Sequence, residues 1–223
     1  MAGLLSGAAI LQYLCPMQRT IAIALVAILC IVSFPASLAS QTAAPSASET
    51  LVIGGGCFWC LEGAFEIVPG VLDVVSGYAG GSLAKPSYER VCTGTTGHAE
   101  VVRISFDPSR VSRAALFDLF FTIHDPTTRD RQGADVGSQY RSVILYADDS
   151  QRRAAVAAIA KVQAGLAAPV VTELKPLKVF WMAEEYHQDY YKKNPDSGYC
   201  RLVVAPKVGK SEEWVKRSGL VKP

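Results

Sequence analysis

Three glycines join a strand-forming run to a helix-forming run in the segment Leu51-Val52-Ile53-Gly54-Gly55-Gly56-Cys57-Phe58-Trp59-Cys60-Leu61-Glu62. The first run predicts a strand over 51–54, and the second predicts a helix that ends near Val68, before Pro69-Gly70. Cys57 is then expected in the first helical turn, where unpaired N–H groups and the helix dipole favour a thiolate. The glycines permit a sharp turn and keep side-chain bulk away from the sulfur. The segment therefore predicts a nucleophile carried on a strand–turn–helix unit.

Strand and helix signals alternate over the following chain. Period-two patterns and β-branched runs predict further strands over 71–78, 99–106, 141–146, 170–174 and 179–181. Apolar residues at helical spacing predict helices over 114–124, 150–166 and 183–191, with loops over 79–97 and 127–139. The order of these elements predicts an α+β fold. We expect a two-layer sandwich with a split βαβ (ferredoxin-like) core and a long irregular C-terminal segment from Arg201.

The N-terminal region has the composition of an export signal. A positive charge at Arg19 precedes a continuous apolar run over 21–34, which is short for a membrane span and suits the hydrophobic region of a signal peptide. Small residues predict cleavage near Ala39, so residues 1–39 are assigned to the signal region and 40–48 to a flexible leader. Residues 1–16 carry no charge, and translation is therefore expected to begin at Met17. The protein is predicted to be exported to the periplasm, and to meet a membrane only if the signal stays uncleaved as an anchor.

Composition excludes some classes of partner and cofactor. The net charge of +2, with 19% charged residues, offers no basic surface for nucleic acid. Of the six cysteines, Cys15 and Cys30 belong to the signal region, and the remaining four are too sparse for a disulfide scaffold. A zinc site needs four suitably spaced ligands, but the Cys57-x-x-Cys60 pair has no matching second pair. The histidines, His98, His124 and His187, show no ligand spacing. No metal and no cofactor are predicted.

Several motifs, taken in order, give the chain a family resemblance. They are Gly56-Cys57-Phe58-Trp59-Cys60, then Tyr88 to Glu100, Phe120-Phe121 with His124-Asp125-Pro126, Gln132 to Ser142, and Ala183 to Tyr190. Together they resemble the peptide methionine sulfoxide reductase A family. The resemblance implies that the protein returns the S epimer of methionine sulfoxide to methionine, in oxidised proteins and as the free amino acid. It assigns the catalytic domain to 49–202 and leaves 203–223 as a solvated C-terminal tail.

The resemblance also assigns roles in the reaction. Cys57 is the expected nucleophile, and Glu100 corresponds to the catalytic acid, whose pKa an apolar pocket would raise. Tyr88 and Tyr140, placed at strand ends, match residues whose hydroxyls hydrogen-bond the sulfoxide oxygen, and Asp135 matches a residue that orders the site and binds substrate. Phe58 and Trp59 resemble the pocket for the methyl group. His98 and His187 are expected to be structural histidines with satisfied hydrogen bonds, and Cys92 a buried or spare thiol.

The sulfenic acid expected on Cys57 has two candidate resolving thiols. Cys200 matches the C-terminal resolving cysteine of the family and is preferred, whereas Cys60 lies one helical turn from Cys57 and stays open as the alternative. A thioredoxin or thioredoxin-like protein is the expected reductant, and a monomer is the expected state. Two other classes remain to be separated by experiment. One is a thioredoxin-like disulfide oxidoreductase, and the other is an exported binding module whose CxxC pair is a structural disulfide.

Overall fold

The computed structural model describes residues 48–220. Its strands are β1 (Glu49–Gly54), β2 (Val71–Ala79), β3 (Ala99–Phe106), β4 (Arg131–Gln132), β5 (Asp135–Val136), β6 (Val143–Tyr146), β7 (Glu173–Pro176) and β8 (Phe180–Met182). Its helices are α2 (Phe58–Glu66), α3 (Tyr88–Cys92), α4 (Arg113–Ile123), α5 (Asp149–Gln163), α6 (Tyr190–Lys193) and α7 (Ala205–Ser218). The described residues also form 3-10 turns at Ser138–Tyr140 and Glu185–His187 and a π-helical turn at Cys200–Val204. The signal-peptide and cleavage predictions lie outside the described residues. Within 48–220, no helix has the length and apolar character needed to cross a membrane.

The protein is a mixed α+β fold built on a six-stranded sheet in the order β7-β6-β1-β3-β2-β8. β1 pairs antiparallel with β3 and with β6, and β2 pairs antiparallel with β3 and with β8. The strands β6 and β7 pair in parallel at the sheet edge. β1 and β3 are the two central strands, so the end of β1 and the start of β3 lie in the interior of the sheet. Cys57 follows the end of β1, and Glu100 lies at the start of β3.

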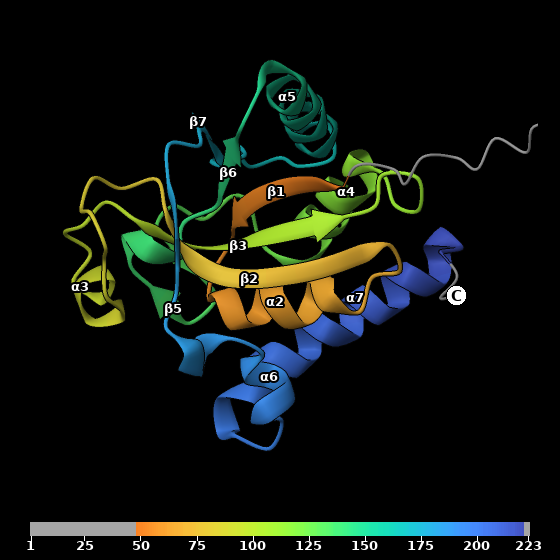
Figure 1. Ribbon diagram of the computed structural model, residues 1–223. Coiled ribbons are helices and arrows are strands. Elements are labelled where there is room, and N and C mark those ends of the chain that lie inside the picture. The colour runs from red at the N-terminus through yellow and green to blue at the C-terminus, as the bar shows by residue number, and fades with distance from the viewer. Residues whose placement is uncertain (1–47, 221–223) are drawn as a thin grey trace, which may run out of the picture. The chain divides into compact units, whose positions relative to one another are not determined.

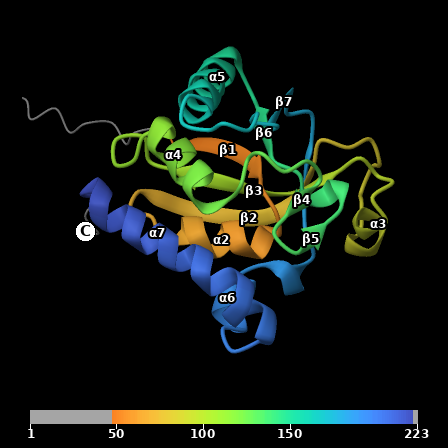
Figure 2. The same ribbon diagram turned by 180° about the vertical axis from the view of Figure 1, so that it is seen from behind.

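The sheet is buried on both faces. In β1, Leu51 and Ile53 join the larger core under the helices, whereas Val52 faces the opposite side, as the two-residue period of a strand requires. Helices α2 and α7 lie together along β2 in both views (Figures 1 and 2), and α7 also packs against α4. On the other face, the chain from β7 to β8 connects opposite edges of the sheet, and Leu177 and Phe180 pack over the smaller core.

Most predicted elements are confirmed, with bounds that differ by a few residues. The main exception is the C-terminal segment, predicted to be irregular, which forms the helix α7. Its buried residues, Val208, Ser211 and Trp214, recur every three positions and continue from Val204 at the end of the π-helical turn, so they form one buried stripe between exposed Lys and Glu residues. The prediction followed the charges and overlooked this stripe, which packs α7 against the core.

Two smaller predictions are also corrected. The helix expected over 183–191 is interrupted, because Asp189 adopts a left-handed conformation (φ 52°) between the 3-10 turn and α6. The long loop after β2 contains the short helix α3. Tyr88 therefore begins a helix and Tyr140 ends a 3-10 turn, so neither lies at the end of a strand.

Candidate active site

Cys57 stands between the glycine turn and α2, as the N-cap residue of that helix. Gly56 has φ +101°, and a Cβ atom there would lie 2.7 Å from the Cγ atom of Gln132. A Cβ at Gly54 would lie 2.6 Å from the Glu100 carbonyl oxygen. Both positions therefore require glycine, one for its backbone conformation and the other because β1 and β3 approach closely. The turn that presents the sulfur is thus sterically specified.

Cys57 is 6% exposed, and the state of its sulfur differs from the predicted thiolate. Burial raises the pKa of the Cys57 thiol, and the hydrogen bond with Cys60 and the nearby Glu100 charge raise it further. Contact with the Tyr199 hydroxyl acts in the opposite direction. The expected helix-dipole effect does not dominate, because burial outweighs it. The Cys57 side chain accepts no capping hydrogen bond at the start of α2, where the Phe58 N–H donates to the Glu100 carboxyl group (3.1 Å). The resting site therefore holds a thiol.

Glu100 lies in β3 with 1% of its surface exposed. Burial raises its pKa to about 8, and the charges of Asp135 and Cys60 add to this effect, while the hydrogen bond from Phe58 opposes it. A carboxyl group with this pKa is largely protonated at neutral pH and can donate a proton. The raised pKa that the sequence led us to expect is confirmed.

Cys60 is fully buried one turn along α2, and its N–H donates to the Cys57 carbonyl oxygen (3.1 Å). The Cys60 pKa is lowered, mainly because Cys57 donates a hydrogen bond to its sulfur and also because of Lys207, while burial and Asp135 oppose this. Cys200 is also buried, at the start of the π-helical turn, where its N–H donates to the Ser197 hydroxyl. The two sulfurs of the CxxC pair therefore interact directly in the structure.

An aromatic wall stands beside the sulfur. The Trp59 indole stacks on the Tyr190 ring with centroids 3.5 Å apart and planes 6° apart. His187 packs against Phe58, with centroids 4.9 Å apart, and against Tyr88 at 4.5 Å. These apolar surfaces suit a methyl group. His187 is 1% exposed and neither ring nitrogen has a hydrogen-bond partner among the described residues, so the prediction of a satisfied structural histidine is wrong.

The predicted polar residues lie around Glu100. Burial raises the pKa of both the Tyr88 and Tyr140 hydroxyls, and the Glu100 charge acts on both in the same direction. The Tyr88 hydroxyl also hydrogen-bonds the thiol of Cys92, which is exposed and not buried. Asp135 accepts a hydrogen bond from the Tyr199 hydroxyl (2.9 Å), which links it to Cys57 through Tyr199. The structure thus gathers Cys57, Tyr88, Tyr140 and Asp135 around Glu100.

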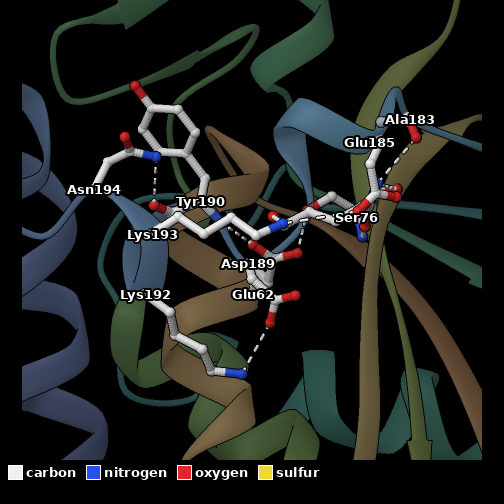
Figure 3. Close-up of polar contacts among 10 residues, drawn as sticks. Glu62, Ser76, Ala183, Glu185, Asp189, Tyr190, Lys192, Lys193 and Asn194 are labelled. Atoms are coloured by element: carbon white, nitrogen blue, oxygen red, sulfur yellow. Dashed lines mark hydrogen bonds and ion pairs between the residues drawn. The ribbon is translucent and has the colours of Figure 1, made fainter.

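A buried carboxyl group, that of Glu62, holds the backbone of Tyr190, whose ring stacks on Trp59. Glu62 of α2 accepts hydrogen bonds from the Ser76 hydroxyl and the Tyr190 N–H, each at 3.1 Å (Figure 3). Its pKa is raised to about 7 by burial, which these hydrogen bonds partly offset. Lys192 of α6 pairs with Glu66 at 2.7 Å and with Asp189 at 3.0 Å. These contacts fix α6 against α2 and hold the Tyr190 ring on Trp59.

Sequence reasoning missed three residues of this site: His187, Tyr190 and Tyr199. Two of them lie inside the motif Ala183–Tyr190, so their position was flagged but not their role. Tyr199 directly precedes Cys200, and no pattern in the sequence indicates that its hydroxyl reaches Cys57. His98 was predicted to be a structural histidine with satisfied hydrogen bonds, and this is confirmed. Its ring nitrogens are hydrogen-bonded to the Gly81 N–H and to the Leu83 carbonyl oxygen.

Comparison with known proteins gives a consistent result. The model of the family "Peptide methionine sulfoxide reductase" matches residues 49–218. A protein from Nautilia profundicola named peptide methionine sulfoxide reductase MsrA is 58% identical over 160 residues, which cover 71% of this chain and 91% of that protein. The MsrA of Halobacterium salinarum is 53% identical over 168 residues, 74% of this chain and 95% of that protein.

Solved structures are similar as well. The methionine sulfoxide reductase A of Corynebacterium diphtheriae has a TM-score of 0.63 and 37% identity, and the match covers 70% of this chain and 78% of that one. Reduced Mxr1 from Saccharomyces cerevisiae has a TM-score of 0.66 and 36% identity, covering 70% and 91%.

Proposed function

Since the chain belongs to the peptide methionine sulfoxide reductase family and reduces methionine sulfoxide, we propose that it acts on the S epimer with Cys57 as nucleophile and Glu100 as acid. One observation carries this assignment. The buried Glu100 carboxyl group accepts the N–H of Phe58, the residue next to Cys57, at 3.1 Å, and its pKa is raised to about 8. An acid that is protonated at neutral pH therefore stands beside the attacking sulfur.

In the first step the Cys57 sulfur attacks the sulfoxide sulfur while Glu100 protonates the sulfoxide oxygen. The proton that Cys57 loses restores the Glu100 carboxyl group, the oxygen moves to Cys57, and methionine leaves a sulfenic acid behind. The Tyr199 hydroxyl contacts the Cys57 sulfur and donates to Asp135 in the resting site, and it can turn its O–H to the sulfur as negative charge forms there. The tyrosines Tyr88 and Tyr140 supply hydroxyl donors to the sulfoxide oxygen, and Asp135 holds Tyr199 in place.

The aromatic wall selects the epimer in this proposal. Phe58 and Trp59 receive the methyl group, while the oxygen must point at Glu100 and the two tyrosines. Because the three substituents of the sulfur are then fixed in space, only one configuration at sulfur fits. Tyr190 supports this wall because its ring stacks on Trp59 at 3.5 Å.

For the second step the geometry favours Cys60 as the first resolving thiol over Cys200, which the family resemblance prefers. Cys60 is hydrogen-bonded to Cys57, and its pKa is lowered by that bond. Its thiolate attacks the sulfenic acid, the S–O bond breaks, and water leaves after protonation. A dithiol protein of the thioredoxin class then reduces the disulfide by thiol–disulfide exchange.

The test is single and multiple turnover on the separated S and R epimers of a methionine sulfoxide peptide. We expect reduction of the S epimer alone, driven by dithiothreitol or thioredoxin and lost in Cys57→Ser. Cys60→Ser should still form one equivalent of methionine but fail in thioredoxin-driven turnover, whereas Cys200→Ser should turn over. The opposite result for the two variants would return the resolving role to Cys200. Disulfide exchange without reduction of either epimer would support the thioredoxin-like alternative.

We further propose that residues 1–39 direct export to the periplasm and that the mature protein is a monomer. The export proposal rests on the charge and apolar run described above, and the monomer is the default expectation for the chain. N-terminal sequencing of the protein from a periplasmic fraction should find cleavage after Ala39, with Ser40 as the new first residue, and light scattering should give a monomer mass. Retention of the full chain in the membrane fraction would contradict cleavage.

The split βαβ architecture is likewise proposed for the central part of the fold. The neighbouring order β6-β1-β3-β2 supports it, together with α2 between β1 and β2 and α4 between β3 and β6. Domain bounds of 49–202 stay a prediction that limited proteolysis would check.

A further inference from the structure

Lys207 is a basic side chain of the C-terminal helix that reaches the catalytic turn. It lies in the first turn of α7, which packs along α2 (Figure 2), and it is partly buried. A Cβ atom at Gly56 would lie 3.4 Å from the Lys207 Nζ atom. The ammonium group is therefore next to the residue that precedes Cys57, although the two lie near opposite ends of the described chain.

Lys207 lowers the pKa of the Cys60 thiol through its charge and, to a smaller degree, through a hydrogen bond from its ammonium group. Five charged or titratable groups interact with this sulfur. They are Cys57 from the same turn, Glu100 from β3, Asp135 from β5, Tyr199 from the segment before Cys200, and Lys207 from α7. Of these, Lys207 alone is a cation. None of the ion pairs among residues 48–220 includes it, so its charge is not neutralised by a carboxylate in contact.

We propose that Lys207 is a catalytic cation of the disulfide-forming step, which stabilises the Cys60 thiolate that attacks the Cys57 sulfenic acid. The inference rests on the proposed function, because it needs a sulfenic acid on Cys57 and a resolving role for Cys60. In this step the Cys60–Cys57 S–S bond forms and the S–O bond of the sulfenic acid breaks. Cys60 is oxidised, the Cys57 sulfur is reduced, and the oxygen leaves with two protons as water.

The same contact serves the recycling step. When an external dithiol attacks the disulfide at Cys57, Cys60 leaves as a thiolate, and a leaving thiol departs faster when its pKa is lower. The buried surroundings of Cys60 strengthen the effect of one nearby cation, because few water molecules screen it. Lys207 therefore acts whenever charge develops on Cys60, while Glu100 and the tyrosines act on the sulfoxide oxygen.

The test compares Lys207→Met with Lys207→Arg, which keeps the charge, and with Lys210→Met as a matched control. Lys210 is on the same helix, is exposed, and lines the same open cavity of about 460 Å³ as Lys207. Reduced full-length protein is mixed with excess methionine sulfoxide peptide without reductant. Methionine release reports the first step, dimedone trapping counts the sulfenic acid, and loss of free thiols follows disulfide formation over a range of pH.

We expect Lys207→Met to slow disulfide formation about tenfold at neutral pH, because loss of the cation lowers the thiolate fraction of Cys60. Methionine release should change much less, trapped sulfenic acid should increase, and the pH profile of disulfide formation should move to higher pH. Lys207→Arg should recover most of the rate, and Lys210→Met should match the wild type. The methionine burst in the same sample shows that each variant is folded.

Wild-type rates and an unshifted pH profile of disulfide formation in Lys207→Met would overturn the role of Lys207 alone. By contrast, a wild-type protein that releases no methionine would overturn the proposed function itself. Equal slowing of both steps in Lys207→Met, without recovery by arginine, would show that the side chain only supports the fold.

Discussion

Replacing Glu100 by Gln tests the proposed acid with little change in shape. The glutamine carbonyl oxygen can still accept the Phe58 N–H that now donates to the carboxyl group at 3.1 Å, so the start of α2 keeps its cap. What the variant loses is the ability to give up a proton. Since the side chain is 1% exposed, no solvent molecule can easily take its place.

The expected loss follows from the pKa of the buried group. Glu100 has a pKa of about 8, so at neutral pH most molecules hold the proton that the sulfoxide oxygen needs. General acid catalysis contributes about 10² to 10⁴ in rate. We expect Glu100→Gln to release methionine about 10² to 10⁴ times more slowly at pH 7. The wild-type rate of methionine release should also fall as pH rises through about 8, and the pH–rate profile of the variant should lack this decline.

The same substitution has a signature in stability. The folded-state pKa of Glu100 is about 8, above the ordinary value of about 4.3, so this group's stabilising effect is complete below pH about 4 and is lost as pH rises through 8. The full loss is roughly 5 kcal/mol at about 1.36 kcal/mol per pKa unit. Glu100→Gln should therefore show a smaller decline of unfolding free energy between pH 5 and 9 than the wild type does.

The assay is quench-flow release of methionine in a single turnover, with urea unfolding over the same pH range. Cys57→Ser serves as the inactive control. A variant that keeps the wild-type rate, or one that slows while keeping the descending limb near pH 8, would refute the assignment of Glu100. An unchanged pH dependence of stability would show that the carboxyl group is ionised in the folded protein.

Three other predictions concern the scaffold and the pocket. Trp214→Ala should lower the free energy of unfolding by about 3–5 kcal/mol in urea titration, because the 6% exposed indole joins α7 to the core. Gly56→Ala should destabilise the protein and slow methionine release, since φ is +101° there, whereas Gly209→Ala, with open space around its Cβ, should be neutral or stabilising. Tyr190→Leu should raise KM several-fold with a smaller change in kcat, because Trp59 loses a ring stacked at 3.5 Å; an unchanged KM would argue against the pocket.

Local sequence patterns predicted most of the secondary structure, because in the central elements the residues that favour a strand or helix are also the residues that the core buries. β3 was predicted with its observed bounds, since its apolar residues alternate with the period of a strand. The pattern failed where charges obscured a buried stripe, as in α7, and where one residue broke a helix, as at Asp189. In both cases the segment contacts a distant element: α7 packs on α2 and α4, and Asp189 contacts Glu62 and Glu66 of α2.

The site shows the same division. Motifs alone indicate Cys57 as the proposed nucleophile, Glu100 as the proposed acid, and the aromatic residues beside Cys57. They do not indicate that burial, the contact with Cys60 and the Glu100 charge raise the pKa of the Cys57 thiol, or that Glu100 accepts the first N–H of α2. A position at the start of a predicted helix indicates that a negative charge would be stabilised there by the helix dipole. Only the packed structure shows which side chain accepts the N–H groups of that helix end.

The sequence by itself determined the family, and it indicated Cys57 as the proposed nucleophile with the glycine turn beside it, because these depend on residue identity over a short span. The tertiary structure alone decided which groups tune the two sulfurs. Lys207 reaches Cys60 from the far end of the chain, and Tyr199 reaches Cys57 with Asp135 behind it. Such effects depend on distance and desolvation, and folding sets both by bringing together segments that share no local pattern.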